Sequence, residues 1–299
     1  HHQSEDYNLS TALRQTGTGA FVSWVFYIPM FLIGIPSYVF VSVASLNLIY
    51  QFWVHSEHIP KLGWYENYFV TASNHRVHHA QNEQYIDKNY GGVFIIWDRM
   101  FGTHKIEDEN EACIYGIRST LNTFNPVWAN LHVYVKIVKE MWLSTSWKDK
   151  LYAPFARTSW TPASFPSDAK KDNFNAETFK KYDPAISPKY KAYALFQYLF
   201  ITYIFLVFIQ GNYLNYSQLW VTISMMTFTM FCTSMLFDGK KGTILEIVRL
   251  GLCLSIGAYA YFQISLTDIA MSVIIYSVIN ILLLPLIHSP KVIYSPKTG

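Results

Sequence analysis

Hydrophobic residues fall in long, well-separated runs along this chain of 299 residues. The first run, residues 17–54, contains no Lys, Arg, Asp or Glu, and Gly34 and two prolines interrupt it. Glycine and proline end helices and form turns. The pattern therefore predicts a hairpin over 18–54, made of two short apolar helices at about 18–33 and 37–54.

Each arm of this hairpin is close to the lower length limit for a membrane crossing. A helix that spans a bilayer needs about 20 residues and rarely fewer than about 17. The pair therefore fits either a deep re-entrant hairpin or two full crossings. Both arrangements return the chain to the membrane face that it left, so the residues on either side of the hairpin are expected on one face.

Four more apolar runs lie near the end of the chain, and each is long enough to cross a bilayer as a helix. They cover residues 192–210, 217–237, 243–262 and 268–288. A polar region, 55–190, separates them from the hairpin and holds most of the Lys and Arg. Within it, residues 126–147 predict an amphipathic helix at the membrane interface. The prolines between 154 and 190 predict an irregular linker.

The composition also indicates a membrane protein. Only 14% of the residues are charged, against about 25% in ordinary soluble domains. The net charge of +3 is small, so nucleic acid is not an expected partner. The three cysteines are widely spaced and indicate neither a disulfide framework nor a zinc motif. We predict an all-α polytopic membrane protein with a helical hairpin, a histidine-rich cytosolic region and four C-terminal transmembrane helices.

The charges of the connecting segments predict the orientation. The connector 238–242 is basic, and the tail 289–299 carries two lysines. The positive-inside rule places both in the cytoplasm, and an even number of crossings places 55–190 there as well. Glu246 and Arg249 lie three residues apart in the third of the four segments, so we expect them to pair within the helix.

Histidines form the most distinctive chemical pattern in the chain. His75, His78 and His79 have the spacing HxxHH, and residues three and four apart share one face of a helix. Three imidazoles at one point repel one another when protonated, whereas a metal ion binds them together as neutral ligands. The hairpin would bring further histidines to the same membrane face, namely His1, His2 and His55.

Six histidines exceed the four ligands of a structural zinc site, which usually includes cysteine. The number suggests two metal ions that hold a small ligand between them. Two iron ions would support oxidation by O2, whereas two zinc ions would support hydrolysis, and the ligand type alone does not separate the two. A site at the membrane surface favours the hydrocarbon chain of a lipid as substrate.

Several motifs resemble those of the fatty acid hydroxylase/sterol desaturase superfamily of integral membrane di-iron proteins. The resemblance extends over nearly the whole chain and is most specific over residues 1–103. It rests on the opening HHQSEDYNLSTALRQ, on YQFWVHSE at 50–57, on HRVHH at 75–79, and on the stretches 86–93 and 95–103.

The family pattern consists of HxxxH, then HxxHH, then a lone histidine, then a final HxxHH. The resemblance implies six metal ligands and catalytic residues, which are His1, His2, His55, His75, His78 and His79. His58 has no counterpart in the pattern, and we expect it beside the site or at the surface. We expect the other three histidines to be structural, namely His104, His132 and His288. The HxxxH pair and the first histidine of the middle motif have no match, so we expect this chain to be part of a longer protein.

Within the superfamily, the motifs are similar to those of members that cleave ether lipids. This implies a monooxygenase that uses two iron ions, O2 and tetrahydrobiopterin. The substrates would be alkylglycerols and lyso ether lipids, and the products a fatty aldehyde and a glycerol derivative. The resemblance also implies the endoplasmic reticulum membrane, a histidine cluster facing the cytosol, and a pterin-recycling system as partner.

Acidic and amide side chains near the histidines are candidates to orient the imidazole N–H groups. They are Glu5, Asp6, Asn8, Asp87 and Asn89. Helix capping and turn formation are equally weighted alternatives for these residues.

We expect three parts in the chain. They are a di-iron catalytic region over 1–125, an interfacial helix and linker over 126–190, and a four-helix transmembrane region over 191–299. Two other functions remain open from the sequence alone. One is a sterol or fatty acyl hydroxylase or desaturase of the same superfamily, and the other is a shortened, inactive membrane protein.

Overall fold

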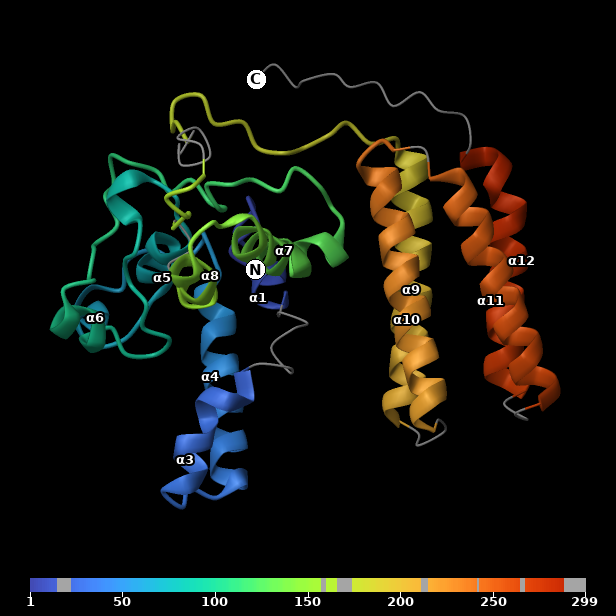
Figure 1. Ribbon diagram of the computed structural model, residues 1–299, viewed down its shortest axis with the longest axis horizontal. Helices are drawn as coiled ribbons and strands as arrows, with labels where there is room; N and C mark the ends of the chain where they lie inside the picture. The colour runs from blue at the N-terminus through green and yellow to red at the C-terminus, as the bar shows by residue number, and fades with distance from the viewer. Residues whose placement is uncertain are drawn as a thin grey trace. The chain divides into compact units, whose positions relative to one another are not determined.

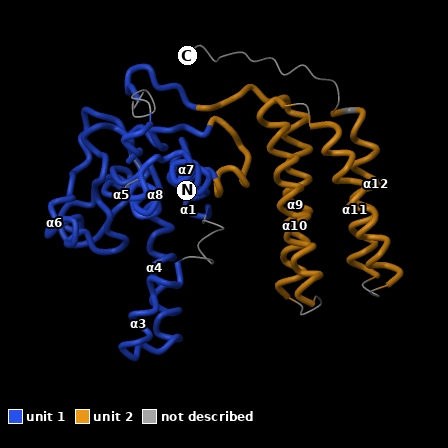
Figure 2. The backbone as a smooth tube through the Cα atoms, viewed as in Figure 1, with its two compact units in different colours: residues 1–121, 132–181 blue, residues 122–131, 182–299 orange. Residues whose placement is uncertain are grey.

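The computed structural model describes residues 1–14, 23–156, 160–165, 174–210, 215–240, 242–263 and 267–287. The chain divides into two compact units, shown in different colours in Figure 2. Unit 1 comprises residues 1–121 and 132–181, and unit 2 comprises 122–131 and 182–299. The described residues contain no β-strand, only two isolated bridges. The all-α prediction is therefore confirmed.

The predicted hairpin is present in unit 1 (Figure 1). Its first arm is a 3-10 turn, η1 (Ser23–Tyr27), that continues into α3 (Ile28–Leu32), and its second arm is α4 (Ser37–Val54). Gly34 makes the turn with a φ of +90°, a conformation that favours glycine. The ring of Phe40 packs against η1 and α3, with centroid distances of 4.7 Å to Tyr27 and 5.5 Å to Phe31. The expected start of the first arm, at residue 18, lies outside the described residues.

The part of unit 1 that follows α4 is built from short helices and turns. They are η2 (Gly63–Asn67), α5 (Ala72–His79), η3 (Glu83–Tyr85) and α6 (Ile96–Phe101). Residues 93–97 are a short apolar run whose length fits either a helical turn or a strand. The structure gives a single antiparallel bridge between Phe69 and Phe94, after which α6 begins.

The expected helix over 126–147 is present as α7 (Pro126–Leu143), which ends four residues before the predicted end. At its end the Ser144 hydroxyl donates to the Glu140 carbonyl oxygen at 2.6 Å. Ser146 then caps a further helix, α8 (Trp147–Tyr152), and a 3-10 turn, η4 (Ala153–Phe155), follows. The helix ends early because these serines bond to nearby backbone groups in competition with the helix.

Unit 2 contains the four predicted apolar helices. They are α9 (Pro188–Gln210), α10 (Tyr216–Phe237), α11 (Thr243–Gln263) and α12 (Thr267–Ile287). Together with α4, the described residues contain five helices long and apolar enough to cross a membrane. The chain is therefore a multi-pass membrane protein. His288 lies outside the described residues.

The expected pair inside α11 is also confirmed. The Arg249 guanidinium donates from Nε to Glu246 Oε2 at 3.0 Å, and both side chains are buried. Tyrosines from two other helices complete the group, because Arg249 also donates to the hydroxyls of Tyr193 at 3.2 Å and Tyr276 at 2.7 Å. Helices α9, α11 and α12 are thereby joined at one level.

Candidate metal centre

Six histidines from three separate places in unit 1 lie together in one group, which we call the histidine cluster. They are His1, His2, His55, His75, His78 and His79. Two precede α1 (Leu9–Ala12), one directly follows α4, and three lie on α5. Ring centroids of neighbouring members are between 4.2 Å and 5.5 Å apart.

Three Nε2 atoms of the cluster have separations typical of ligands on one metal ion. His75 Nε2 lies 3.2 Å from His55 Nε2 and 3.2 Å from His79 Nε2. Metal–nitrogen bonds of about 2.0–2.1 Å place neighbouring ligand atoms roughly 3.0–3.4 Å apart. One ring nitrogen from each of His1, His55 and His79 also falls within 4.8 Å of the other two. The donor set therefore fits a metal ion.

Backbone carbonyls orient two of these rings. His55 Nδ1 lies 2.7 Å from the carbonyl oxygen of Gln51, one turn back along α4. His78 Nδ1 lies 3.3 Å from the carbonyl oxygen of Lys88. A ring that donates its Nδ1–H to a carbonyl presents the lone pair of Nε2 to a metal. His75 Nδ1 is buried and has no hydrogen-bond partner among the described residues, so a ring nitrogen of His75 is available for a ligand bond.

Burial keeps the cluster in the form that binds metal. Desolvation, with a further contribution from His78, lowers the pKa of His2 to about 3. Desolvation likewise lowers the pKa of His75 and His79 well below the usual range, and neighbouring imidazoles lower both further. Only neutral imidazole has a lone pair for a metal. These three rings are therefore neutral at pH 7, the form in which imidazole binds metal.

Helix α5 is short, and its ends and one side are held by specific contacts. Thr71 and Asn74 form a capping box at the start of α5. On one side, Arg76 makes a bidentate ion pair with Glu107, with both N–O distances 2.7 Å. Burial raises the pKa of the Glu107 carboxyl, but the bonds from Arg76 outweigh this and the pKa is lowered.

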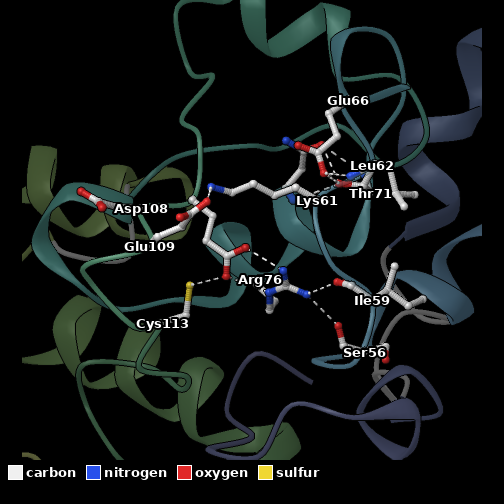
Figure 3. A network of polar contacts seen from close by, with 12 residues as sticks. Ser56, Ile59, Lys61, Leu62, Glu66, Thr71, Arg76, Asp108, Glu109 and Cys113 are labelled. Carbon is white, nitrogen blue, oxygen red and sulfur yellow. Dashed lines mark hydrogen bonds and ion pairs between the residues drawn. The ribbon is translucent and has the colours of Figure 1, made fainter. Parts of the chain in front are cut away.

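Arg76 also ties α5 to the segment that follows His55. Its Nη1 donates to the carbonyl oxygens of Ser56 at 3.0 Å and Ile59 at 2.9 Å (Figure 3). The guanidinium thereby fixes the helix that carries three cluster histidines against the residues next to a fourth. Planar, multi-donor recognition of this kind suits arginine and not lysine.

A tight strap over residues 87–91 positions the carbonyl that meets His78. Asn89, with a φ of +53°, donates from Nδ2 to the carbonyl oxygens of Asn74 at 3.0 Å and Lys105 at 2.8 Å. The Asp98 carboxylate accepts from the backbone N–H groups of Tyr90 at 2.7 Å and Gly91 at 2.8 Å. Gly91 is required here, since a Cβ would lie 2.6 Å from the Phe94 carbonyl oxygen.

Four of the five polar candidates for orienting the histidines have other described bonds. Asn8 caps α1 by accepting from the Ser10 N–H at 3.0 Å, and Asp87 accepts from the nearby Tyr90 hydroxyl at 2.8 Å. Asp6 forms an ion pair with Lys181, and Asn89 holds the strap described above. Glu5 lines a cavity. Whether any of the five orients an imidazole stays a prediction.

The sequence did not identify the groups that contact the histidine rings in the structure. The Gln51 carbonyl could have been anticipated, because it lies four residues before His55 on a helix. The Lys88 carbonyl could not, because it depends on the fold of the strap. Tyr7 was also missed: its buried ring stacks on His55 at 5.5 Å, and its hydroxyl donates to the Val54 carbonyl at 2.8 Å.

The other described histidines have different positions. His58 is exposed, and its backbone N–H bonds to the Ser56 hydroxyl. The backbone N–H of His104 bonds to the Asp98 carbonyl oxygen, and His132 lies on α7. The described ring contacts of the cluster include none of these three.

A cavity of about 780 Å³ opens beside the cluster in unit 1. His55 and Tyr7 lie in its wall, together with polar side chains such as Glu57. Tyr115 also lines it and stacks on Tyr7 at 4.8 Å. The cavity is large enough for a small molecule or a lipid head group, and it reaches a cluster histidine directly.

The family model described as fatty acid hydroxylase matches residues 1–103, the range that holds all six cluster histidines. Residues 1–103 therefore form a fatty acid hydroxylase domain. No solved structure matches the chain significantly.

Curated relatives extend the similarity beyond this family region. The chain is 36% identical to alkylglycerol monooxygenase of Homo sapiens over 253 residues, which are 83% of this chain and 56% of the relative. It is 41% identical to the Danio rerio protein of the same name, over 67% of this chain and 45% of that protein. The Caenorhabditis elegans protein of that name is 32% identical over 83% and 53%, respectively. The chain thus spans about half the length of the relatives that it matches.

Proposed function

We propose that this chain is the histidine-bearing part of an ether-lipid monooxygenase with two iron ions. The observation that carries the proposal is the convergence of six histidines, within a fatty acid hydroxylase region, in a chain similar to alkylglycerol monooxygenases. The substrates would be alkylglycerols and lyso ether lipids. Tetrahydrobiopterin would supply electrons, and a pterin-recycling system would regenerate it.

The cluster residues would hold the irons through their ring nitrogens, with His55 presenting Nε2 because its Nδ1 faces the Gln51 carbonyl. The chemistry supplied by two bound irons is activation of O2 for insertion into the C–H bond beside the ether oxygen. The hydroxylated carbon is then a hemiacetal, which collapses to a fatty aldehyde and a glycerol derivative. The strap and Arg76 hold the ring positions fixed.

The polar cavity beside His55 is suited to the glycerol end of the substrate. Its lining includes Glu57, Ser56 and Asn8, which can hydrogen-bond hydroxyl groups. The alkyl chain would then extend toward the membrane. The protein would lie in the endoplasmic reticulum membrane with this cavity on the cytosolic side.

A product assay tests the proposal. The full-length protein is incubated with an alkylglycerol, O2 and tetrahydrobiopterin, and the fatty aldehyde that forms is measured. We expect aldehyde only with added pterin, its loss in His75→Ala, and normal yield in the control His132→Ala, which lies on α7 outside the cluster and the cavity lining. Turnover of a free sterol or fatty acyl lipid, with no aldehyde from alkylglycerol, would assign the chain to a hydroxylase or desaturase instead. No turnover and no bound iron would assign it to an inactive membrane protein.

A further inference from the structure

Unit 2 contains an open-sided cavity of about 570 Å³ among its four long helices. All of α9, α10, α11 and α12 contribute to the lining, for example through Ile204, Met225, Cys253 and Val273. The described lining residues include no carboxylate, ammonium, guanidinium or imidazole group. The cavity is therefore suited to an apolar, uncharged occupant.

The length of the cavity matches a lipid chain. Its lining residues on α10 run from Asn215, at the helix N-cap, to Thr229, fourteen residues further on. At a rise of 1.5 Å per residue this corresponds to about 21 Å. Half of the hydrocarbon core of a bilayer is about 15 Å thick. A single extended acyl or alkyl chain would therefore fit along the cavity.

A group of hydrogen-bonded polar side chains lies at the inner end of the cavity. Tyr276 lines the cavity, and its ring stacks on Phe200, another lining residue, at 3.7 Å. Its hydroxyl accepts from Arg249 at 2.7 Å and donates to the Gln197 side chain. Gln197 in turn donates to Asn280 at 2.5 Å. Buried polar groups that are fully paired in this way hold helices in a fixed position.

Helices α11 and α12 pack tightly against each other, so the cavity does not result from loose packing throughout unit 2. A Cβ at Gly257 on α11 would lie 3.0 Å from Ile274 and 3.2 Å from Val273 on α12. These two helices therefore meet closely, and the space remains among the four. If an apolar cavity of this size were empty, the side chains that line it would lose dispersion contacts.

We propose that unit 2 binds one long-chain lipid with an uncharged polar head. The tail lies in the cavity with its end near Tyr276. The head lies at the exposed end, where Asn215, Ser217 and Gln218 line the opening and carry hydrogen-bonding groups. This binding site is separate from the histidine cluster and does not depend on the proposed oxygenase activity.

Photolabelling of the purified chain in nanodiscs tests the site. The probe is a monoacylglycerol with a sixteen-carbon chain and a diazirine near the tail end, and labelled residues are mapped by mass spectrometry. The test variant is Ile204→Trp, which places a large ring in the cavity. The matched control is Leu206→Trp, on the same helix but half exposed and outside the lining.

We expect labels on Met225, Cys253 and other lining residues in the unmodified chain. Ile204→Trp should lower that labelling at least fivefold, Leu206→Trp should change it less than twofold, and His55→Ala should leave it intact. Labels spread over outward-facing residues such as Leu206 and Val278, unaffected by Ile204→Trp, would mean surrounding bilayer lipid only and would overturn the proposal. Equal labelling by the matching fatty acid, which is anionic, would overturn the choice of head group.

Discussion

At the scale of single residues, the two ring nitrogens of His55 have different neighbours. In His55 the Nδ1 atom faces a carbonyl of its own helix, and the Nε2 atom faces His75. The HxxHH spacing was enough to predict that three rings share a face. It was not enough to predict which atoms would hold each ring, because the Lys88 carbonyl belongs to a strap with two positive-φ residues.

Removal of one cluster imidazole should lower metal content while the fold persists. His55→Ala deletes a ring whose Nε2 lies 3.2 Å from His75 Nε2. We expect bound iron, measured by mass spectrometry of the purified chain, to fall by at least half. The matched control is His58→Ala, three residues away and exposed, which should retain all of its iron. Equal iron in both variants would remove His55 from the ligand set.

Acid should destabilise the metal-free chain through the same rings. Burial lowers the pKa of His2 to about 3 and keeps His75 and His79 neutral. Unfolded histidine has a pKa of about 6.5, so below that pH the unfolded chain binds more protons than the folded chain. As the pH falls below about 6.5, and while it stays above the folded pKa, each such histidine lowers the free energy of unfolding by about 1.4 kcal/mol per pH unit.

The measurement is thermal denaturation of chelator-treated chain from pH 7.5 to 5. We expect the midpoint to be constant above pH 7 and to fall steeply below 6.5. A chain loaded with iron should show a smaller fall over the same range, since ring nitrogens bound to metal do not take up protons until the metal leaves. A flat profile for the metal-free chain would contradict the burial of neutral rings.

At the scale of elements, α5 depends on tertiary contacts because eight residues are too few for a stable isolated helix. Its capping box could be read in the sequence from Thr71 and Asn74. The pairing of Arg76 with Glu107 could not, because the partners are far apart in the chain and meet only when the loop folds back.

Loss of the Arg76 guanidinium should loosen α5. Arg76→Met retains most of the apolar stem but leaves the half-buried Glu107 carboxylate without its ion-pair partner. Breaking such a pair costs about 3 kcal/mol, so we expect a lower denaturation midpoint and weaker iron binding. The control is Lys61→Met, which removes an ion pair to the exposed carboxylate of Glu109. Its midpoint should match that of the parent chain, and an equal loss in both variants would argue against a special role for Arg76.

At the scale of the whole molecule, hydrophobic runs predicted the architecture well. Helix α4 and the four helices of unit 2 lie within a few residues of their predicted bounds. The Glu246–Arg249 pair was also predicted, since both lie on one helix. Its partners Tyr193 and Tyr276 were not, because helix spacing says nothing about which faces of separate helices meet.

We propose that the hairpin gathers distant histidines into one centre for two irons. The iron content of the purified chain, combined with iron K-edge X-ray absorption, tests this directly. We expect about two irons per chain, nitrogen ligands near 2.1 Å, and a second iron at roughly 3.5–4 Å. A chain that binds no iron, or binds it without imidazole ligands, would rule out such a centre.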